Sequence, residues 1–120
     1  MPNNLISLDV AKKMTALYRR ERENVLGLPY KEKKILAVCE TFDRQAFDTL
    51  LSEAGCTAVR IYYGMSDDLL IHAIAVGVNS NNEDILPAPG ASVASGTDAV
   101  IIEESIRCPD KCPPESPLNS

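Results

Sequence analysis

Residues 59–79 read VRIYYGMSDDLLIHAIAVGVN, and this stretch decides the fold. Over 59–65 the side chains alternate between two faces, the period of two that is typical of a β-strand. Residues 66–68 supply a polar turn, and 69–79 is apolar on both faces except at His72 and one glycine. We therefore predict a β-hairpin. Because a strand that is apolar on both sides is usually central in its sheet, the second strand should be covered on both faces.

Downstream of the hairpin, the sequence predicts a small antiparallel meander of three to four strands. Asn79 to Asn82 is a strong turn signal, and Ile85-Leu86 can return as a short third strand. Residues 87–98 are rich in Pro, Ala, Gly and Ser and predict a long loop. Residues 99–103 contain Val-Ile-Ile and predict one more strand.

Upstream of the hairpin, the first helical segment begins at Ser7, whose side chain suits a helix N-cap. Apolar residues then recur at helical spacing for about 17 residues, until Gly27 ends the pattern. The window 31–40 is ambiguous, because a short apolar run follows Lys- and Glu-rich sequence. Its composition favours a second short helix over a strand.

A second well-marked helix begins at Asp43, a suitable N-cap residue. Phe42 precedes this cap and Phe47 falls at the fourth helical position, the spacing of a hydrophobic staple. Gly55 then supplies a residue that can adopt the left-handed conformation with which many helices close.

These elements predict an α+β fold in a single domain spanning 1–120, since about 120 residues fit one domain. Residues 1–55 should be mainly helical, and 56–106 should form the sheet with its long loop at 87–98. Residues 107–120 should form an irregular Cys- and Pro-rich tail, because four prolines in nine residues exclude regular structure.

Charge and hydropathy limit the classes of function that the chain is expected to have. The formal net charge is −5, which argues against nucleic-acid binding. Residues 1–34 carry eight Lys/Arg and four Asp/Glu, whereas 35–120 carry four Lys/Arg and thirteen Asp/Glu. No apolar run reaches the roughly 18 residues that a membrane span needs. The first residues lack the pattern of a secretory signal, so we expect a cytoplasmic location.

The pair Cys108 and Cys112 allows three interpretations: a small disulfide loop, a redox dithiol or two thiolate ligands of a metal. Redox motifs usually place two residues between the cysteines at a helix N-terminus, unlike this pair. A zinc site needs two further ligands, for which Cys39, Cys56 and His72 are candidates. Reduced structural thiols or an incidental disulfide are the simpler explanation, and no cofactor is expected.

His72 is the single histidine, and a satisfied sheet histidine is the simpler reading than a catalytic one. The segment Gly90–Ala94 resembles a nucleophile elbow but lacks its final glycine. No catalytic residue is therefore predicted. A small-molecule enzyme in which 87–98 covers His72 and Tyr62 remains an alternative.

The motif RIYYGM at 60–65, His72 in the returning strand, and the tail RCPDKCPPESPLNS at 107–120 together resemble a group of small uncharacterised bacterial proteins. The resemblance runs from about residue 40 to the end. It implies that the hairpin and the tail belong to one unit, but it implies no activity and no site residue.

The leading hypothesis is a non-enzymatic binding or interaction module. Its partner would be an unidentified protein or a second copy of the chain, and its possible binding surface comprises Arg60, Tyr62 and His72. A metal-binding or thiol-redox protein using Cys108 and Cys112 is the alternative of a different class. One face of the hairpin needs a cover, which the 87–98 loop, the tail or a second subunit could provide.

Overall fold

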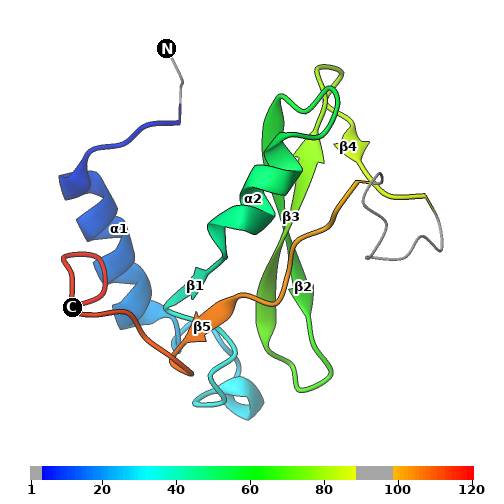
Figure 1. Cartoon of the computed structure of the whole chain (residues 1–120). Coiled ribbons are helices and arrows are strands. Elements are labelled where there is room, and N and C mark those ends of the chain that lie inside the picture. The colour runs from blue at the N-terminus through cyan, green and yellow to red at the C-terminus, as the bar shows by residue number, and fades with distance from the viewer. Residues whose placement is uncertain (1–3, 89–98) are drawn as a thin grey trace. The chain divides into compact units, whose positions relative to one another are not determined.

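The computed structural model describes residues 4–88 and 99–120, and these divide into two compact units (Figure 1). The terminal unit comprises 1–39 with 107–120, and the hairpin unit comprises 40–106. The expectation that both belong to one domain stays a prediction.

The hairpin unit is built on a three-stranded antiparallel meander of β2 (Ala58–Met65), β3 (Ile71–Val78) and β4 (Asp84–Ile85), in the order β2-β3-β4. The predicted α+β class and the central position of the second strand are therefore confirmed. Strands β2 and β3 pair along their full length, from Ala58 opposite Val78 to Met65 opposite Ile71 (Figure 1).

The turn between β2 and β3 is longer than the three polar residues suggest. The backbone N–H of Ser66 donates to Leu70 O at 3.0 Å, and Leu69 N donates to Ser66 O at 2.8 Å. Leu69 adopts a φ of +69°, which is incompatible with an extended strand. The second strand consequently begins at Ile71, two residues later than expected.

Helix α2 (Arg44–Leu51) begins where the sequence predicts. The Asp43 carboxylate accepts a hydrogen bond from Gln45 N at 2.9 Å. The rings of Phe42 and Phe47 meet edge to face with centroids 5.4 Å apart, as a hydrophobic staple requires. The helix ends at Leu51, earlier than expected, although Gly55 does adopt the left-handed φ of +79°.

The core of the hairpin unit lies between α2 and one face of the sheet. Leu50 and Ala75 are fully buried and Ile102 is 6% exposed. Six partly buried side chains pack against them: Phe42, Ala46, Phe47, Cys56, Val59 and Val100. Since Val59 and Ala75 are odd-numbered residues of β2 and β3, the odd face of the hairpin is the one that α2 covers.

In the terminal unit, α1 (Leu8–Glu21) starts at the predicted cap, where Ser7 Oγ accepts from Val10 N at 3.1 Å. A single 3₁₀ turn, η1 (Leu28–Tyr30), follows after Gly27. In the part of the chain that the structure describes, no helix is both long and apolar enough to traverse a lipid bilayer.

The expectation of a helix within 31–40 is wrong. Glu32 and Lys34 adopt φ values of +58° and +61°, which interrupt any right-handed helix. The backbone carbonyls are taken up by side chains instead: Arg22 donates to Leu36 O at 2.9 Å, and the Tyr18 hydroxyl donates to Ala37 O at 2.5 Å. The segment ends in a strand, β1 (Cys39–Thr41).

Strand β1 pairs with β5 (Ile106–Cys108) in a two-stranded sheet. The predicted irregular tail therefore starts at Pro109 and not at 107. Residues 106–108 can pair because the first proline of the tail comes after them. Arg107, which is 4% exposed, donates to Ile35 O at 3.1 Å.

The predicted strand at 99–103 is reduced to one bridge, in which Ile102 pairs with Ala75. Val100 N donates instead to the Glu53 carboxylate at 2.6 Å, and Glu104 has a φ of +60° that ends the extended backbone. The loop predicted at 87–98 and the Gly90–Ala94 segment fall largely or wholly within 89–98, outside the described residues.

Candidate functional site

The outer edge of β3, the side turned away from β2, is occupied by three separate segments. Ala75 and Ile102 exchange two backbone hydrogen bonds of 2.8 and 2.9 Å. Ala73 N donates to the Glu40 carboxylate at 3.1 and 3.2 Å, and Gly77 pairs with Ile85 of β4. The odd-numbered residues of β3 thus direct their backbone groups away from β2 and find partners there.

The pairing of β3 determines which backbone N–H and C=O groups of β2 have no hydrogen-bond partner in the sheet. Along an antiparallel strand, successive residues direct their N–H and C=O groups to opposite sides. The even-numbered residues of β3 therefore form backbone hydrogen bonds with the residues opposite them in β2, which are Ala58, Arg60, Tyr62 and Gly64. The four remaining residues direct N–H and C=O groups to the outer side: Val59, Ile61, Tyr63 and Met65. We call these four residues the β2 edge.

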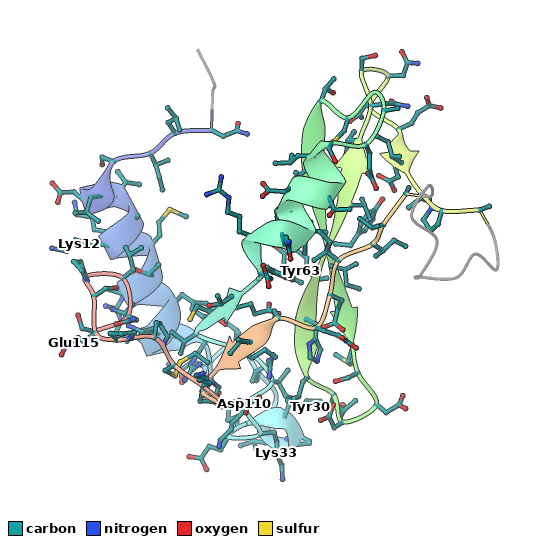
Figure 2. All side chains as sticks on the ribbon, in the orientation of Figure 1. Lys12, Tyr30, Lys33, Tyr63, Asp110 and Glu115 are labelled. Carbon is teal, nitrogen blue, oxygen red and sulfur yellow. A yellow bond between two sulfur atoms is a disulfide. The ribbon has the colours of Figure 1, made fainter. Side chains whose placement is uncertain are left out.

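No described residue pairs with the β2 edge, because β2 is the terminal strand of its sheet. Most side chains of the β2 edge are also unusually exposed to solvent for residues of their type. Ile61 is 42% exposed, Met65 60% and Tyr63 79%, whereas Val59 at the other end joins the core (Figure 2 labels Tyr63). A long apolar strand with unpaired backbone groups is a template for pairing with another extended chain.

The opposite, even face of the hairpin carries a polar cluster that spans all three strands. The Arg60 guanidinium of β2 contacts Asp84 of β4 at 2.5 Å and Asn82 Oδ1 at 2.5 Å. The Tyr62 hydroxyl donates to the second oxygen of the Asp84 carboxylate. Both donors therefore converge on one carboxylate, and the cluster holds Arg60 and Tyr62 in fixed positions.

The electrostatic consequences follow from these hydrogen bonds. Donation by Tyr62, followed by that of Arg60 and its positive charge, lowers the pKa of Asp84. The hydrogen bond to Asp84 raises the pKa of Tyr62, because the carboxylate holds the hydroxyl hydrogen and a phenolate would face a negative charge. The cluster is thus most stable with Asp84 ionised and Tyr62 neutral.

A second cluster lies at the turn end of the same even face. His72 Nδ1 is 3.1 Å from Glu103 Oε1, and His72 Nε2 is 3.1 Å from Ser66 Oγ. Ser66 Oγ in turn contacts the Asp68 carboxylate. This hydroxyl contact, together with two backbone hydrogen bonds and the charge of His72, lowers the pKa of Asp68.

The order serine, histidine, carboxylate resembles a nucleophilic triad, but the serine hydroxyl donates to a different acceptor, Asp68. A serine hydroxyl has one hydrogen, and its contact with Asp68 uses that hydrogen. That hydrogen is then not directed to His72 Nε2, whereas the base of a triad must accept the serine hydrogen. His72 thus lies between Glu103 and Ser66, and these contacts tie the turn to the returning strand.

The structure brings the three residues of the expected binding surface, Arg60, Tyr62 and His72, to one face of the hairpin. They are even-numbered residues on adjacent strands, so their side chains share the face that α2 leaves open. The small-molecule-enzyme alternative placed a lid over His72 and Tyr62. Most of that segment, 89–98, lies outside the described residues.

The cysteine candidates lie apart along the chain. Cys108 and Cys112 form a disulfide with a Cα–Cα distance of 4.5 Å, while Cys39 and Cys56 are free thiols. Cys108 and Cys112 belong to the terminal unit, and Cys56 and His72 to the hairpin unit. Across residues 4–88 and 99–120, no group of three His, Cys, Asp or Glu side chains converges as a metal site requires.

Sequence reasoning missed the partners that hold the site together, namely Glu40, Ser66, Asp84 and Glu103. Asp84 and Glu103 lie 22 and 31 positions beyond Tyr62 and His72 respectively, as the residue numbers show. No local pattern links residues so far apart. The apolar character of both faces of β3 is the one available signal, because it predicts a central strand with a neighbour on each side.

The chain was compared with known proteins through family models, curated protein sequences and solved structures, and none of the three comparisons found a match.

Proposed function

We propose that this chain is a non-enzymatic binding module that takes up an extended segment of a protein partner along the β2 edge. One observation carries the proposal. The outward backbone groups of β3 are met by Glu40, Ile102 and β4, while those of β2 have no partner among the described residues. Within residues 4–88 and 99–120, the hairpin therefore has one paired edge and one unpaired edge.

The chemistry of an open edge favours an extended partner over other occupants. A helix or a compact loop can cover apolar side chains, but it cannot supply alternating N–H and C=O groups in register. An added strand supplies both and gains affinity from the backbone pairs, while alternate side chains give specificity. The even-face residues Arg60 and Tyr62 are held in position by Asp84, so little side-chain entropy is lost on binding.

The alternatives rest on weaker support. The Ser66 hydroxyl donates to Asp68, so its hydrogen is not directed to His72 as a serine–histidine catalytic pair requires. The Cys108–Cys112 disulfide fits a staple of the tail as well as a redox pair, and Cys108 is only 5% exposed. Three residues separate these cysteines, unlike the usual redox motif, and no group of three potential metal ligands converges among the described residues, so we advance no redox or metal function.

We further propose the cytoplasm as the compartment, and the disulfide makes this testable. Cytoplasmic thiols are kept reduced in most organisms, so in that compartment the Cys108–Cys112 pair should be a dithiol and the disulfide should form only on oxidation. When cells are quenched in acid and the protein is alkylated under denaturing conditions, all four cysteines should then be modified. Recovery of two reactive thiols per chain would place the protein in an oxidising compartment instead.

The binding proposal is tested with a display library of short random linear peptides selected against the full chain. We expect selected peptides to protect the amides of Val59, Ile61, Tyr63 and Met65 from hydrogen exchange. Ile61→Lys should weaken their binding about tenfold or more, because an edge lysine blocks strand addition.

The matched control is Leu51→Lys on α2, where a leucine of similar exposure (53%) is replaced away from the edge. This variant should bind the selected peptides as the unmodified chain does. Selection of no peptide, or of peptides that protect other amides and ignore Ile61→Lys, would refute strand addition at β2.

A further inference from the structure

We infer that the extended segment accepted by the β2 edge is the β2 strand of a second copy of this chain, paired antiparallel about a twofold axis at Tyr62. This inference rests on the proposed function and names its partner. It predicts a continuous six-stranded sheet, with the strand order β4-β3-β2-β2-β3-β4 across the two copies.

The register follows from which backbone groups are unpaired. A twofold axis perpendicular to the sheet would pair the two β2 strands antiparallel. In each facing pair of residues, the two residue numbers then add up to the same even number. The β2 edge consists of residues 59, 61, 63 and 65, which are symmetric about 62. Centring the axis on Tyr62 is therefore the one register that gives every member of the edge a partner. Val59 then faces Met65 of the second copy, and Ile61 faces Tyr63.

Side-chain chemistry agrees with this register. Arg60 is the single charged residue of β2, and here it faces Gly64 of the second copy, so no like charges oppose one another. On the odd face, the exposed side chains of Ile61, Tyr63 and Met65 are brought into cross-strand pairs. Aromatic and β-branched pairs of this kind stabilise antiparallel sheets.

On the even face, side chains of the two copies meet at the twofold axis itself. Tyr62 faces its own copy in a pair without direct hydrogen bonds, where antiparallel side chains approach most closely. Its hydroxyl is held by Asp84, so each ring is positioned before association. Next to the axis, Ile74 Cδ1 of the neighbouring strand fills the space at Gly64 and would lie 2.7 Å from a Cβ at that position.

The decisive experiment uses two variants of the full chain that carry opposite charges on the edge. One is Ile61→Lys with Tyr63→Lys, and the other is Ile61→Glu with Tyr63→Glu. Because residue 61 faces residue 63 across the axis, each variant alone places like charges opposite each other. The unmodified chain should sediment at twice the chain mass of 13.1 kDa, each variant at one chain mass, and their mixture at twice that mass again.

Two controls separate the edge from general effects of charge. Thr49→Lys with Leu51→Lys adds the same charge to exposed positions of α2 and should leave the dimer intact. Circular dichroism of every variant shows whether it folds. Folding should be retained, since Ile61 and Tyr63 are 42% and 79% exposed.

The register is tested by disulfide trapping in a background of Cys39→Ser with Cys56→Ser, which removes the two free thiols. Tyr62→Cys should form a covalent dimer under mild oxidation, because paired Cα atoms at such a position lie about 4.5 Å apart. Ile61→Cys should not, because it faces Tyr63.

Three results would overturn the inference: a monomer at every concentration, a dimer that survives the edge charges, or stronger trapping with Ile61→Cys than with Tyr62→Cys. These results are distinct from failure of the proposed function. A monomer that still binds library peptides along the β2 edge retains strand addition and loses the second copy as its partner, whereas a monomer that binds no peptide loses both.

Discussion

Arg60 and Asp84 form an ion pair of 2.5 Å across the width of the sheet, although their strands are not neighbours. Arg60 lies opposite Val76 of β3 and Asp84 lies opposite Val78, so the pair crosses the even face of the central strand. Val76 and Val78 are 2% and 4% exposed. The ion pair thus ties β2 to β4 over the part of β3 that is best protected from solvent.

This ion pair predicts a dependence of stability on pH. The pKa of Asp84 is lowered in the folded chain by Tyr62 and Arg60. An unfolded aspartate titrates near 3.9, so the stabilisation is complete above about pH 5 and is lost as the pH falls through the lower folded-state pKa. The urea midpoint of the unmodified chain should therefore fall in acid, and Asp84→Asn should lower the midpoint at pH 7 and flatten the acid decline.

The control for this titration is Asp67→Asn, which removes the same charge from the turn without touching Arg60 or Tyr62. Its acid decline should match that of the unmodified chain. If both substitutions flattened the acid decline of the urea midpoint equally, then the overall charge of the chain, and not the Arg60–Asp84 contact, would determine how steeply stability falls with pH.

The assignment of inner and outer backbone groups on β2 can be tested with two proline substitutions at adjacent tyrosines. Tyr63→Pro removes an N–H that points to the open edge, a position at which sheets tolerate proline. Tyr62→Pro removes an N–H that bonds β3 and leaves its acceptor unsatisfied, which costs about 1–3 kcal/mol. In the isolated chain, the thermal midpoint should therefore fall much further for Tyr62→Pro. Equal losses would show that the alternation along β2 is assigned wrongly.

Close packing at Gly77 predicts a sharp contrast between two glycine substitutions. A Cβ at Gly77 would lie 2.8 Å from Glu53 Oε1 and 3.1 Å from Cys56 Sγ, so Gly77→Ala should lower the free energy of unfolding by about 1–3 kcal/mol. At Gly27 the nearest atoms lie at 3.8 and 3.9 Å, and Gly27→Ala should change it by less than about 0.5 kcal/mol.

The clash at Gly77 can be attributed to Glu53 by a double-mutant cycle. If the carboxylate is the obstacle, Gly77→Ala should be less damaging in a Glu53→Ala background than in the unmodified chain. Strictly additive losses in denaturant unfolding would assign the effect to another contact.

The Cys108–Cys112 disulfide should stabilise the tail locally. It closes a loop with a sequence separation of four, for which chain entropy gives about 2 kcal/mol. Cys112→Ser should speed the exchange of the Lys111 amide, which donates to Arg107 O at 2.9 Å within that loop. Cys56→Ser, at a free thiol, serves as the control and should leave this amide unchanged. Protection of Lys111 that survives Cys112→Ser would show that the loop is held by other contacts.

Some features of the fold could be predicted because their causes are local. The caps Ser7 and Asp43, the Phe42–Phe47 staple and the period-two pattern of β2 all act within a few residues. The failures share the opposite character. Residues 31–38 form no helix because distant side chains, such as Arg22 and Arg107, satisfy their carbonyls. The strand predicted at 99–103 is limited by Glu53, which takes the amide of Val100.

The candidate site likewise has features that the sequence predicts and features that depend on tertiary contacts. Alternation placed Arg60 and Tyr62 on one face, and the apolar run around His72 made its strand central, because side-chain periodicity is written into neighbouring residues. The tertiary structure alone decided that Asp84 joins Arg60 to Tyr62, that Ser66 and Glu103 hold His72, and that Glu40, Ile102 and β4 protect the β3 edge. These contacts join residues far apart in the chain, and which backbone edge stays open depends on all of them together.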